Sequence, residues 1–135
     1  GTNFADALAA SSYAAMKGQP ILLSETNYLP QATKNAIEDL GIKNTVVCGG
    51  PAVVSESVFN QLPHPKRVYG NDRYLTALEM AKEFMPESTK HVYISTGLNF
   101  PDALPEVSWQ PRITAVCYWY REIMQYLSSK YRIFI

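Results

Sequence analysis

The sequence of 135 residues lacks an excess of charge of either sign, and it also lacks long apolar runs. Twelve Lys and Arg residues balance twelve Asp and Glu residues, so there is no overall basic field to attract nucleic acid. No apolar stretch approaches the roughly 20 residues that a membrane-spanning helix needs. We therefore predict no nucleic-acid partner and no membrane partner.

Cysteine is also scarce. Cys48 and Cys117 stand in no CxxC or histidine-rich spacing, so we expect neither a metal site nor a disulfide framework, and no cofactor. We expect both to behave as small buried hydrophobic residues. An initiator Met and a signal peptide are absent as well, and we therefore expect a piece of a longer protein.

The sequence does contain one motif twice. "GTNFADAL" at residues 1–8 returns as "GLNFPDAL" at residues 97–104, and six of the eight residues match at a constant shift of 96 positions. This period exceeds the roughly 20–50 residues of solenoid and propeller repeats, so it indicates duplication of a whole small domain. We therefore expect the chain to begin in the middle of one repeat unit, to contain one full period and to continue into the start of the next unit.

Segments typical of helices and of buried strands alternate between the two copies of the motif. Helices are predicted at residues 6–18, 29–42, 55–62 and 71–85, and strands at 21–23, 44–50, 66–70 and 90–97. Such alternation indicates βαβ units, because parallel strands need a crossover connection, which is usually a helix. We therefore predict an α/β fold of Rossmann or toprim type: a single small three-layer domain with a mostly parallel sheet of about four strands flanked by helices.

Four stretches, in the order of the chain, resemble one permuted copy of the cell wall binding repeat 2 family. They are "NFADALAASSYAAMKGQPILLSE", "LPQATKNAIEDLGIKNTVVCGGPAVVSESVFNQL", "RVYGNDRYLTALEMAKEF" and "VYISTGLNFPDAL". The resemblance covers residues 1–104 and includes the second motif copy at 97–104. It implies a non-catalytic module of exported Gram-positive proteins, usually present in three tandem copies beside an enzymatic or surface-layer region.

The resemblance also implies a partner and a location. Modules of this family hold proteins non-covalently on the cell wall through anionic wall polymers, so the expected location is secreted, at the cell wall or cell surface. Other repeats of the same kind are expected partners, in the same chain or as a homo-oligomer.

Loops after the predicted strands supply the candidates for polymer contact. Arg73 has a planar guanidinium suited to phosphate or carboxylate, in the first turn of a helix whose N–H groups attract anions. Alternatively, Asp72 caps this helix and Arg73 pairs with a nearby carboxylate. The full candidate set is Gly49, Gly50, Lys66, Arg67, Asp72, Arg73 and Tyr74.

The other members of this set have alternatives too. Lys66 and Arg67 either widen a basic spot or are simply solvated charges. Gly49 and Gly50 lie between a strand and a helix, which suits a phosphate cradle, but they lack the GxGxxG and P-loop patterns, and a tight turn is the alternative.

The two motif copies carry side-chain oxygens at predicted strand-to-helix turns. These residues are Asn3, Asp6, Asn99 and Asp102. We expect them to accept hydrogen bonds from the first N–H groups of the following helix, and a ligand role is the secondary alternative.

Little in the sequence favours an enzyme. Its serines form no GxSxG elbow, and His64 and His91 stand in no metal-ligand spacing. Glu25 with Asp6 or Asp102 could form a carboxylate pair that holds magnesium. The alternatives to a binding module are thus a remnant of a wall-remodelling enzyme, such as an amidase, and a nucleotide- or metal-dependent phosphoryl-transfer domain.

Residues 105–135 diverge from the first copy. Pro105 and Pro111 preclude a regular helix through the segment that matches the first helix, so we predict a helix at 113–129 followed by a strand-like "YRIFI". Seven of the sixteen aromatic residues lie in this tail. We expect the tail to pack on the same domain, and stacking of its aromatic rings on sugars is the alternative.

Overall fold

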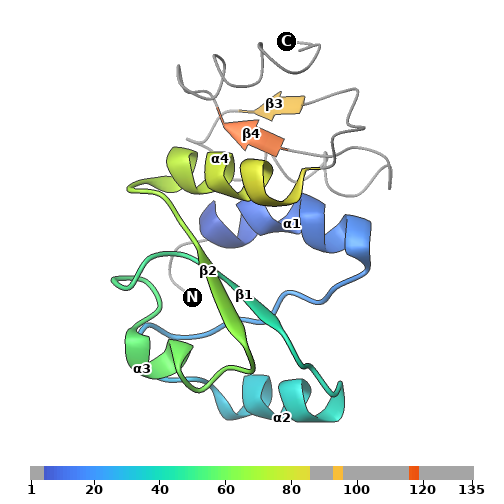
Figure 1. Ribbon diagram of the computed structural model, residues 1–135, viewed down its shortest axis with the longest axis vertical. Coiled ribbons are helices and arrows are strands. Elements are labelled where there is room, and N and C mark those ends of the chain that lie inside the picture. The colour runs from blue at the N-terminus through green and yellow to red at the C-terminus, as the bar shows by residue number, and fades with distance from the viewer. Residues whose placement is uncertain (1–4, 86–92, 96–115, 119–135) are drawn as a thin grey trace.

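The computed structural model describes residues 5–85, 93–95 and 116–118, which form helices alternating with short strands (Figure 1). In chain order the elements are α1 (Ala5–Lys17), α2 (Gln31–Asp39), β1 (Thr45–Cys48), α3 (Glu56–Phe59), β2 (Pro65–Val68), α4 (Arg73–Phe84), β3 (Tyr93–Ser95) and β4 (Val116–Tyr118). None of the helices in the described ranges has the length and apolar character to cross a membrane.

Glycine ends the first two helices, which the sequence predicts over residues 6–18 and 29–42. Gly18 follows α1 with φ +62° and Gly41 follows α2 with φ +60°, a left-handed conformation that glycine adopts at little cost. At α3, Ser55 occupies the N-cap position, but its side chain makes no capping hydrogen bond. The Ser55 hydroxyl instead lies 3.0 Å from that of Ser57.

Strands β1 and β2 pair in parallel, and α3 lies in the connection between them. The register places Val46 opposite Lys66 and Val47 opposite Arg67. The strands predicted at 44–50 and 66–70 are therefore confirmed, and the connection is the βαβ crossover that the alternating pattern indicated.

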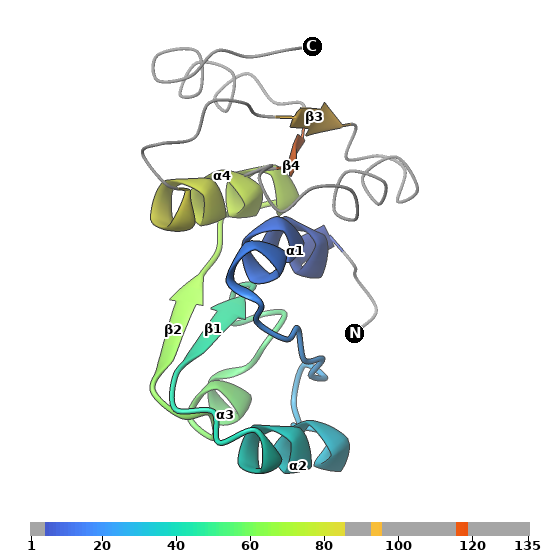
Figure 2. The ribbon, with the colours of Figure 1, turned by 90° about the vertical axis from the view of Figure 1, so that its right-hand side faces the viewer.

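Strands β3 and β4 form a second parallel pair, with Ile94 opposite Cys117. Both views show helices α1 and α4 side by side, with the β1–β2 pair on one side and the β3–β4 pair on the other (Figures 1 and 2). The described strands thus form two parallel pairs. The single flanked sheet of about four strands stays a prediction, as does the division into domains at residue 104.

Two apolar clusters hold the β1–β2 pair between the helices. On one face, Val47 packs with Val54 and the fully buried Val58. On the other face, Val68 packs with Ala10 of α1 and Met80 of α4. The small alanines of α1 let this helix approach closely, and each buried aliphatic side chain contributes about 1.5–3 kcal/mol. Cys48 is half-buried beside Met80, with 3.7 Å between their sulfur atoms.

Two predictions about secondary structure are wrong. Residues 21–23 form no strand, and their side chains are exposed: Ile21 by 43%, Leu22 by 38% and Leu23 by 61%. A strand needs a hydrogen-bonded partner, and among the described residues none pairs with this segment.

The helix predicted at 113–129 is interrupted by strand β4 at Val116–Tyr118. Valine and tyrosine favour extended backbone, and β3 offers a strand to pair with, which together outweigh the helical periodicity. The rest of the predicted helix and the "YRIFI" segment lie outside the described residues.

Candidate functional site

The loops that follow β1 and β2 lie together at the carboxyl ends of the two strands. The Gly49 N–H donates to the Val68 carbonyl at 3.2 Å and so extends the β1–β2 pairing by one bond. The loop after β1 then turns back through hydrogen bonds from Val53 and Val54 to the Gly50 carbonyl. Ligands of parallel α/β sheets bind beyond the carboxyl ends of strands, so this edge is the candidate site.

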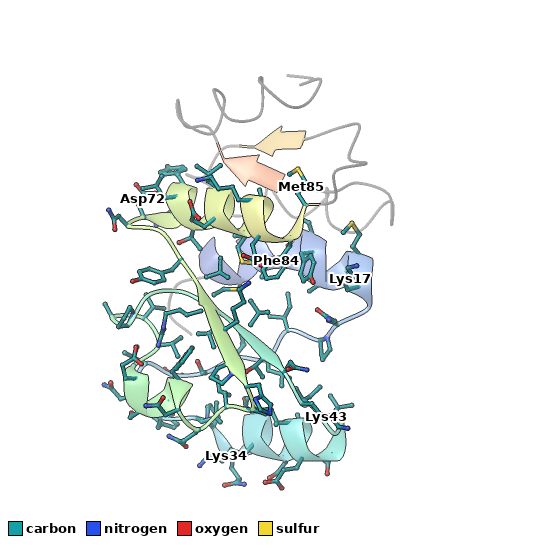
Figure 3. The ribbon with its side chains drawn as sticks, viewed as in Figure 1. Lys17, Lys34, Lys43, Asp72, Phe84 and Met85 are labelled. Carbon is teal, nitrogen blue, oxygen red and sulfur yellow. The ribbon has the colours of Figure 1, made fainter. Side chains whose placement is uncertain are left out.

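Asp72 is the N-cap residue that directly precedes α4, and Figure 3 shows it at the start of this helix. The Asp72 Oδ1 accepts a hydrogen bond of 2.8 Å from the Leu75 N–H, which would otherwise have no partner inside the helix. The structural alternative for Asp72 is therefore confirmed, because this carboxylate caps the helix.

Arg73 and Tyr74 follow the cap and have different environments. Arg73 is exposed at the first residue of α4. Tyr74 is half-buried and packs against Leu8 of α1 and Ala77 of α4. The structure thus brings Arg73 to the surface of the candidate site, and it places much of Tyr74 in the interface between the two helices.

The turn between β2 and α4 is close-packed around Gly70. Its N–H donates to the Thr76 Oγ1 at 3.0 Å, and Thr76 is only 2% exposed. A Cβ at position 70 would lie 2.3 Å from the Leu75 Cβ and 2.5 Å from the Leu75 carbonyl carbon. Only glycine fits here, and the close packing fixes where Asp72 and Arg73 lie relative to the strand ends.

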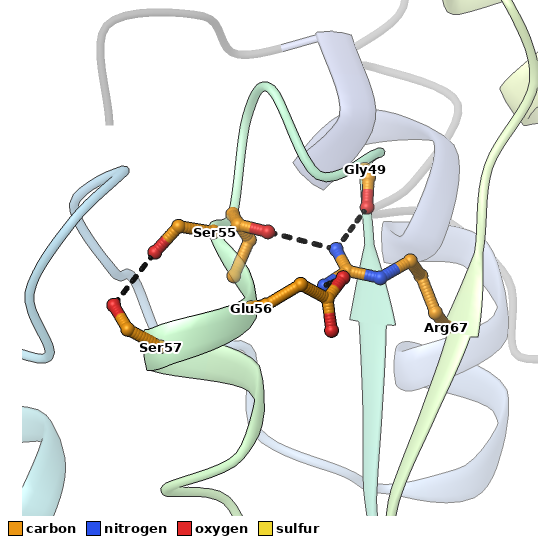
Figure 4. A network of polar contacts seen from close by, with 6 residues as sticks. Gly49, Ser55, Glu56, Ser57 and Arg67 are labelled. Atoms are coloured by element: carbon orange, nitrogen blue, oxygen red, sulfur yellow. Dashed lines mark hydrogen bonds and ion pairs between the residues drawn. The ribbon is translucent and has the colours of Figure 1, made fainter.

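Arg67 holds the loop after β1 in place rather than facing solvent (Figure 4). Its Nη1 donates to the Gly49 carbonyl at 3.0 Å and to the Val54 carbonyl at 2.9 Å. Its Nη2 donates to Glu56 Oε1 at 3.0 Å, and its Cζ lies 4.4 Å from the centre of the Phe59 ring. The side chain is only 11% exposed, and its guanidinium donates to groups of the fold rather than to solvent.

Lys66, the neighbour of Arg67, points to the other face of β2. Its side chain is 56% exposed, and its Nζ donates to Glu83 Oε1 on α4. The structure does not bring Lys66 and Arg67 together as one basic spot, because successive side chains of a strand point to opposite faces.

The two glycines after β1 form a tight turn. Gly49 has φ +126°, is buried, and uses its N–H for the bond to Val68. A Cβ at position 50 would lie 2.9 Å from the Tyr69 Cδ2, so the ring of Tyr69 rests against Gly50. Sequence reasoning did not single out Tyr69, which is 45% exposed at this edge. The available signal in the sequence for a residue at this edge was an aromatic residue directly before a glycine, Gly70.

The remaining candidates lie mostly outside the described residues. These are Asn3, Asn99 and Asp102, while Asp6 lies in the first turn of α1 with no described side chain. Their capping role stays a prediction. Within the described ranges, no three His, Cys, Asp or Glu residues gather in a group that could hold a metal ion.

Comparison with known proteins gives one family match. The profile described as "Cell wall binding domain 2 (CWB2)" matches residues 1–59 and 67–112. Two curated relatives come from Bacillus subtilis (strain 168). N-acetylmuramoyl-L-alanine amidase LytC is 41% identical over 101 residues, which are 75% of this chain and 20% of the amidase. The Amidase enhancer is 35% identical over 107 residues, which are 77% of this chain and 14% of the enhancer.

Two solved structures from Clostridium difficile have a similar fold. Cwp8 has a TM-score of 0.81 and 25% identity over 96% of this chain and 24% of Cwp8. Cwp6 has a TM-score of 0.78 and 20% identity over 96% of this chain and 23% of Cwp6. The chain spans a quarter or less of each of these four proteins.

Proposed function

The chain belongs to the cell wall binding domain 2 family and is a cell wall binding module, and from this premise we propose that its ligand is an anionic polymer of the Gram-positive wall. The family match over residues 1–59 and 67–112 carries the proposal. Attachment is non-covalent and the module performs no reaction of its own.

The edge at the carboxyl ends of β1 and β2 supplies the contact surface. Arg73 is exposed in the first turn of α4, where the helix dipole adds partial positive charge to that of the guanidinium. Tyr69, Asn71 and Val53 are exposed on the neighbouring loops. A flexible polymer that carries phosphate or carboxylate groups could contact Arg73 while its neutral parts lie over Tyr69.

The expected affinity of one such surface is low. The seven basic residues between positions 5 and 85 are matched by eight acidic ones, so long-range attraction is weak. One exposed charge contact contributes only about 0.2–1 kcal/mol. Strong attachment therefore depends on several modules acting on one polymer, since linked sites raise the effective concentration of each other.

A larger protein is the setting we propose for this module. The chain matches a fifth of an amidase and a seventh of an amidase enhancer, so we infer that it positions an exported effector, such as a wall-remodelling enzyme, at the cell surface. The phosphoryl-transfer alternative stays a prediction, because its carboxylate pair of Glu25 with Asp6 or Asp102 includes side chains outside the described residues.

Replacing Arg73 by Ala tests the proposed surface. We expect the Arg73→Ala chain to sediment with purified Gram-positive walls about threefold less well, because it loses an exposed cation at the candidate edge. Lys43→Ala is the matched control: this exposed cation lies just before β1, at the opposite end of the strand pair from Asp72 (Figure 3).

Circular dichroism and urea unfolding of both variants show whether the fold is kept. Equal loss of wall binding in the two variants would contradict an Arg73 contact, whereas loss of stability in Arg73→Ala alone would assign Arg73 a structural role.

A further inference from the structure

Tyr69 directly follows β2 and holds its aromatic ring against the loop after β1. A Cβ built at Gly50 would lie 2.9 Å from the ring's Cδ2, 3.2 Å from Cε2 and 3.6 Å from Cγ. An approach within the plane of the ring would leave at least one neighbour of Cδ2 farther away than this, so Gly50 lies against a face of the ring. The side chain is nevertheless 45% exposed. The ring thus rests with one face on the loop backbone, and its exposed part lies on the side away from that backbone.

The backbone on both sides of Tyr69 is held by hydrogen bonds. The Val68 carbonyl accepts a bond of 3.2 Å from the Gly49 N–H, and the Gly70 N–H donates to the Thr76 Oγ1 at 3.0 Å. Gly70 itself is packed so closely that no Cβ fits there. An aromatic side chain on a fixed backbone loses little conformational freedom when a ligand covers it, so more of the contact energy appears as affinity.

The residues that follow this ring are polar, and their charges oppose each other. Asn71 is exposed, and its amide both donates and accepts hydrogen bonds. Asp72 and Arg73 come next, and both are exposed. Charges of opposite sign side by side give this edge little preference for a polyanion by charge alone. An aromatic face beside an amide suits a sugar ring, whose C–H groups lie on the ring while its hydroxyls donate and accept hydrogen bonds.

We infer that Tyr69 stacks on a pyranose ring of the wall polymer and so gives this module a preference for glycosylated polyanions over the same polyanions without sugar. Gly50 is a positioning residue for this contact, because a side chain there would displace the ring. The inference rests on the proposed function and adds to it the class of unit that the polymer must carry.

Two polymers of equal charge test the preference: poly(glycerol phosphate), and the same polymer carrying glucosyl substituents. Surface plasmon resonance gives the affinity of the full chain for each, and their ratio cancels the contribution of the shared phosphates. We expect the unmodified chain to bind the glucosylated polymer about threefold more tightly, since stacking on one exposed ring is a modest contact. Tyr69→Ala should abolish the difference, while Tyr69→Phe, which keeps the ring, should preserve it.

Gly50→Ala provides a second variant that leaves the ring in the chain. The new Cβ would push the ring of Tyr69 away, and an exposed side chain can move, so the preference should fall while the free energy of unfolding changes little. Tyr28→Ala is the matched control, because this tyrosine is 61% exposed on a different loop, and its loss should leave the preference unchanged. Circular dichroism and urea unfolding of each variant show whether the fold is kept.

Equal affinity of the unmodified chain for the two polymers would overturn the inference and leave the anionic-polymer proposal standing. A preference that survives Tyr69→Ala would overturn it too, because the sugar would then bind elsewhere. Maltotriose, a neutral oligosaccharide of glucose, separates the two claims by saturation-transfer NMR. Binding of maltotriose that is lost in Tyr69→Ala, with no binding of either polymer, would contradict the proposed function and support the stacking contact.

Discussion

Lys66 and Arg67 are adjacent cations in the sequence, and their side chains lie on opposite faces of β2. Arg67 is 11% exposed and donates to two backbone carbonyls of the β1–α3 loop, while Lys66 is 56% exposed and pairs with Glu83. A carbonyl that loses a buried charged donor is left without a partner, whereas a surface ion pair contributes little. We therefore expect Arg67 to contribute more than Lys66 to the stability of the fold.

Arg67→Ala should lower the free energy of unfolding by about 2–3 kcal/mol, because the Gly49 and Val54 carbonyls lose hydrogen bonds to a charged group. Lys66→Ala should change it by less than about 0.5 kcal/mol. Urea denaturation of both variants measures the difference. Equal effects would show that the loop does not depend on Arg67.

At the scale of elements, the β2–α4 turn sets the position of the candidate site. Gly70 leaves no room for a Cβ, Thr76 accepts the Gly70 N–H, and Asp72 caps the helix. The contacts that hold the end of β2, the turn and the start of α4 together thus lie within the seven residues 70–76. The position of Arg73 follows from these contacts, because it is the first residue of the capped helix.

Gly70→Ala should destabilise the fold by about 3 kcal/mol, since the new Cβ would meet backbone and side-chain atoms of Leu75 that cannot move independently. Gly18→Ala is the comparison: open space surrounds this Cβ, and only its φ of +62° is unfavourable, at a cost of about 1 kcal/mol. Thermal unfolding of both variants gives the ranking. A smaller effect at Gly70 than at Gly18 would contradict the close packing described for the turn.

Elements with local signals could be predicted from the sequence, and those that depend on distant partners could not. The helices that end at Gly18 and Gly41 and the strand at 45–48 carry their signals within a few residues. Residues 21–23 have the composition of a strand but no described partner, and β4 is a strand because β3 lies beside it. Pairing is set by the tertiary structure, so the apolar run at 21–23 and the helical periodicity at 113–129 both led to wrong predictions.

The candidate site shows the same contrast between contacts of near neighbours in the sequence, which could be predicted, and contacts of distant residues, which could not. The Asp72 cap is a bond between residues three positions apart, and the sequence suggested it. The partners of Arg67 lie 11–18 positions away, so the sequence could not show that its side chain turns inward. The contact between Tyr69 and Gly50 joins two loops and was missed for the same reason.

On the scale of the whole molecule, the helices α1 and α4 separate two pairs of parallel strands (Figure 2). The shift of 96 residues relates the two copies of the motif at 1–8 and 97–104, and we propose that the chain carries parts of two successive units of the repeat. We propose that each complete unit is an α/β layer structure with a mostly parallel sheet. Units of this kind would act together on one polymer, which compensates for the weak charge of a single site.

Binding to walls before and after removal of their anionic polymers tests the central claim most directly. Purified Gram-positive walls are divided, one half is stripped of its anionic polymers by mild acid, and the fraction of the chain that sediments with each half is measured. We expect at least a tenfold loss of binding to the stripped walls and recovery when the released polymer is restored. Equal binding to both halves would contradict recognition of an anionic polymer.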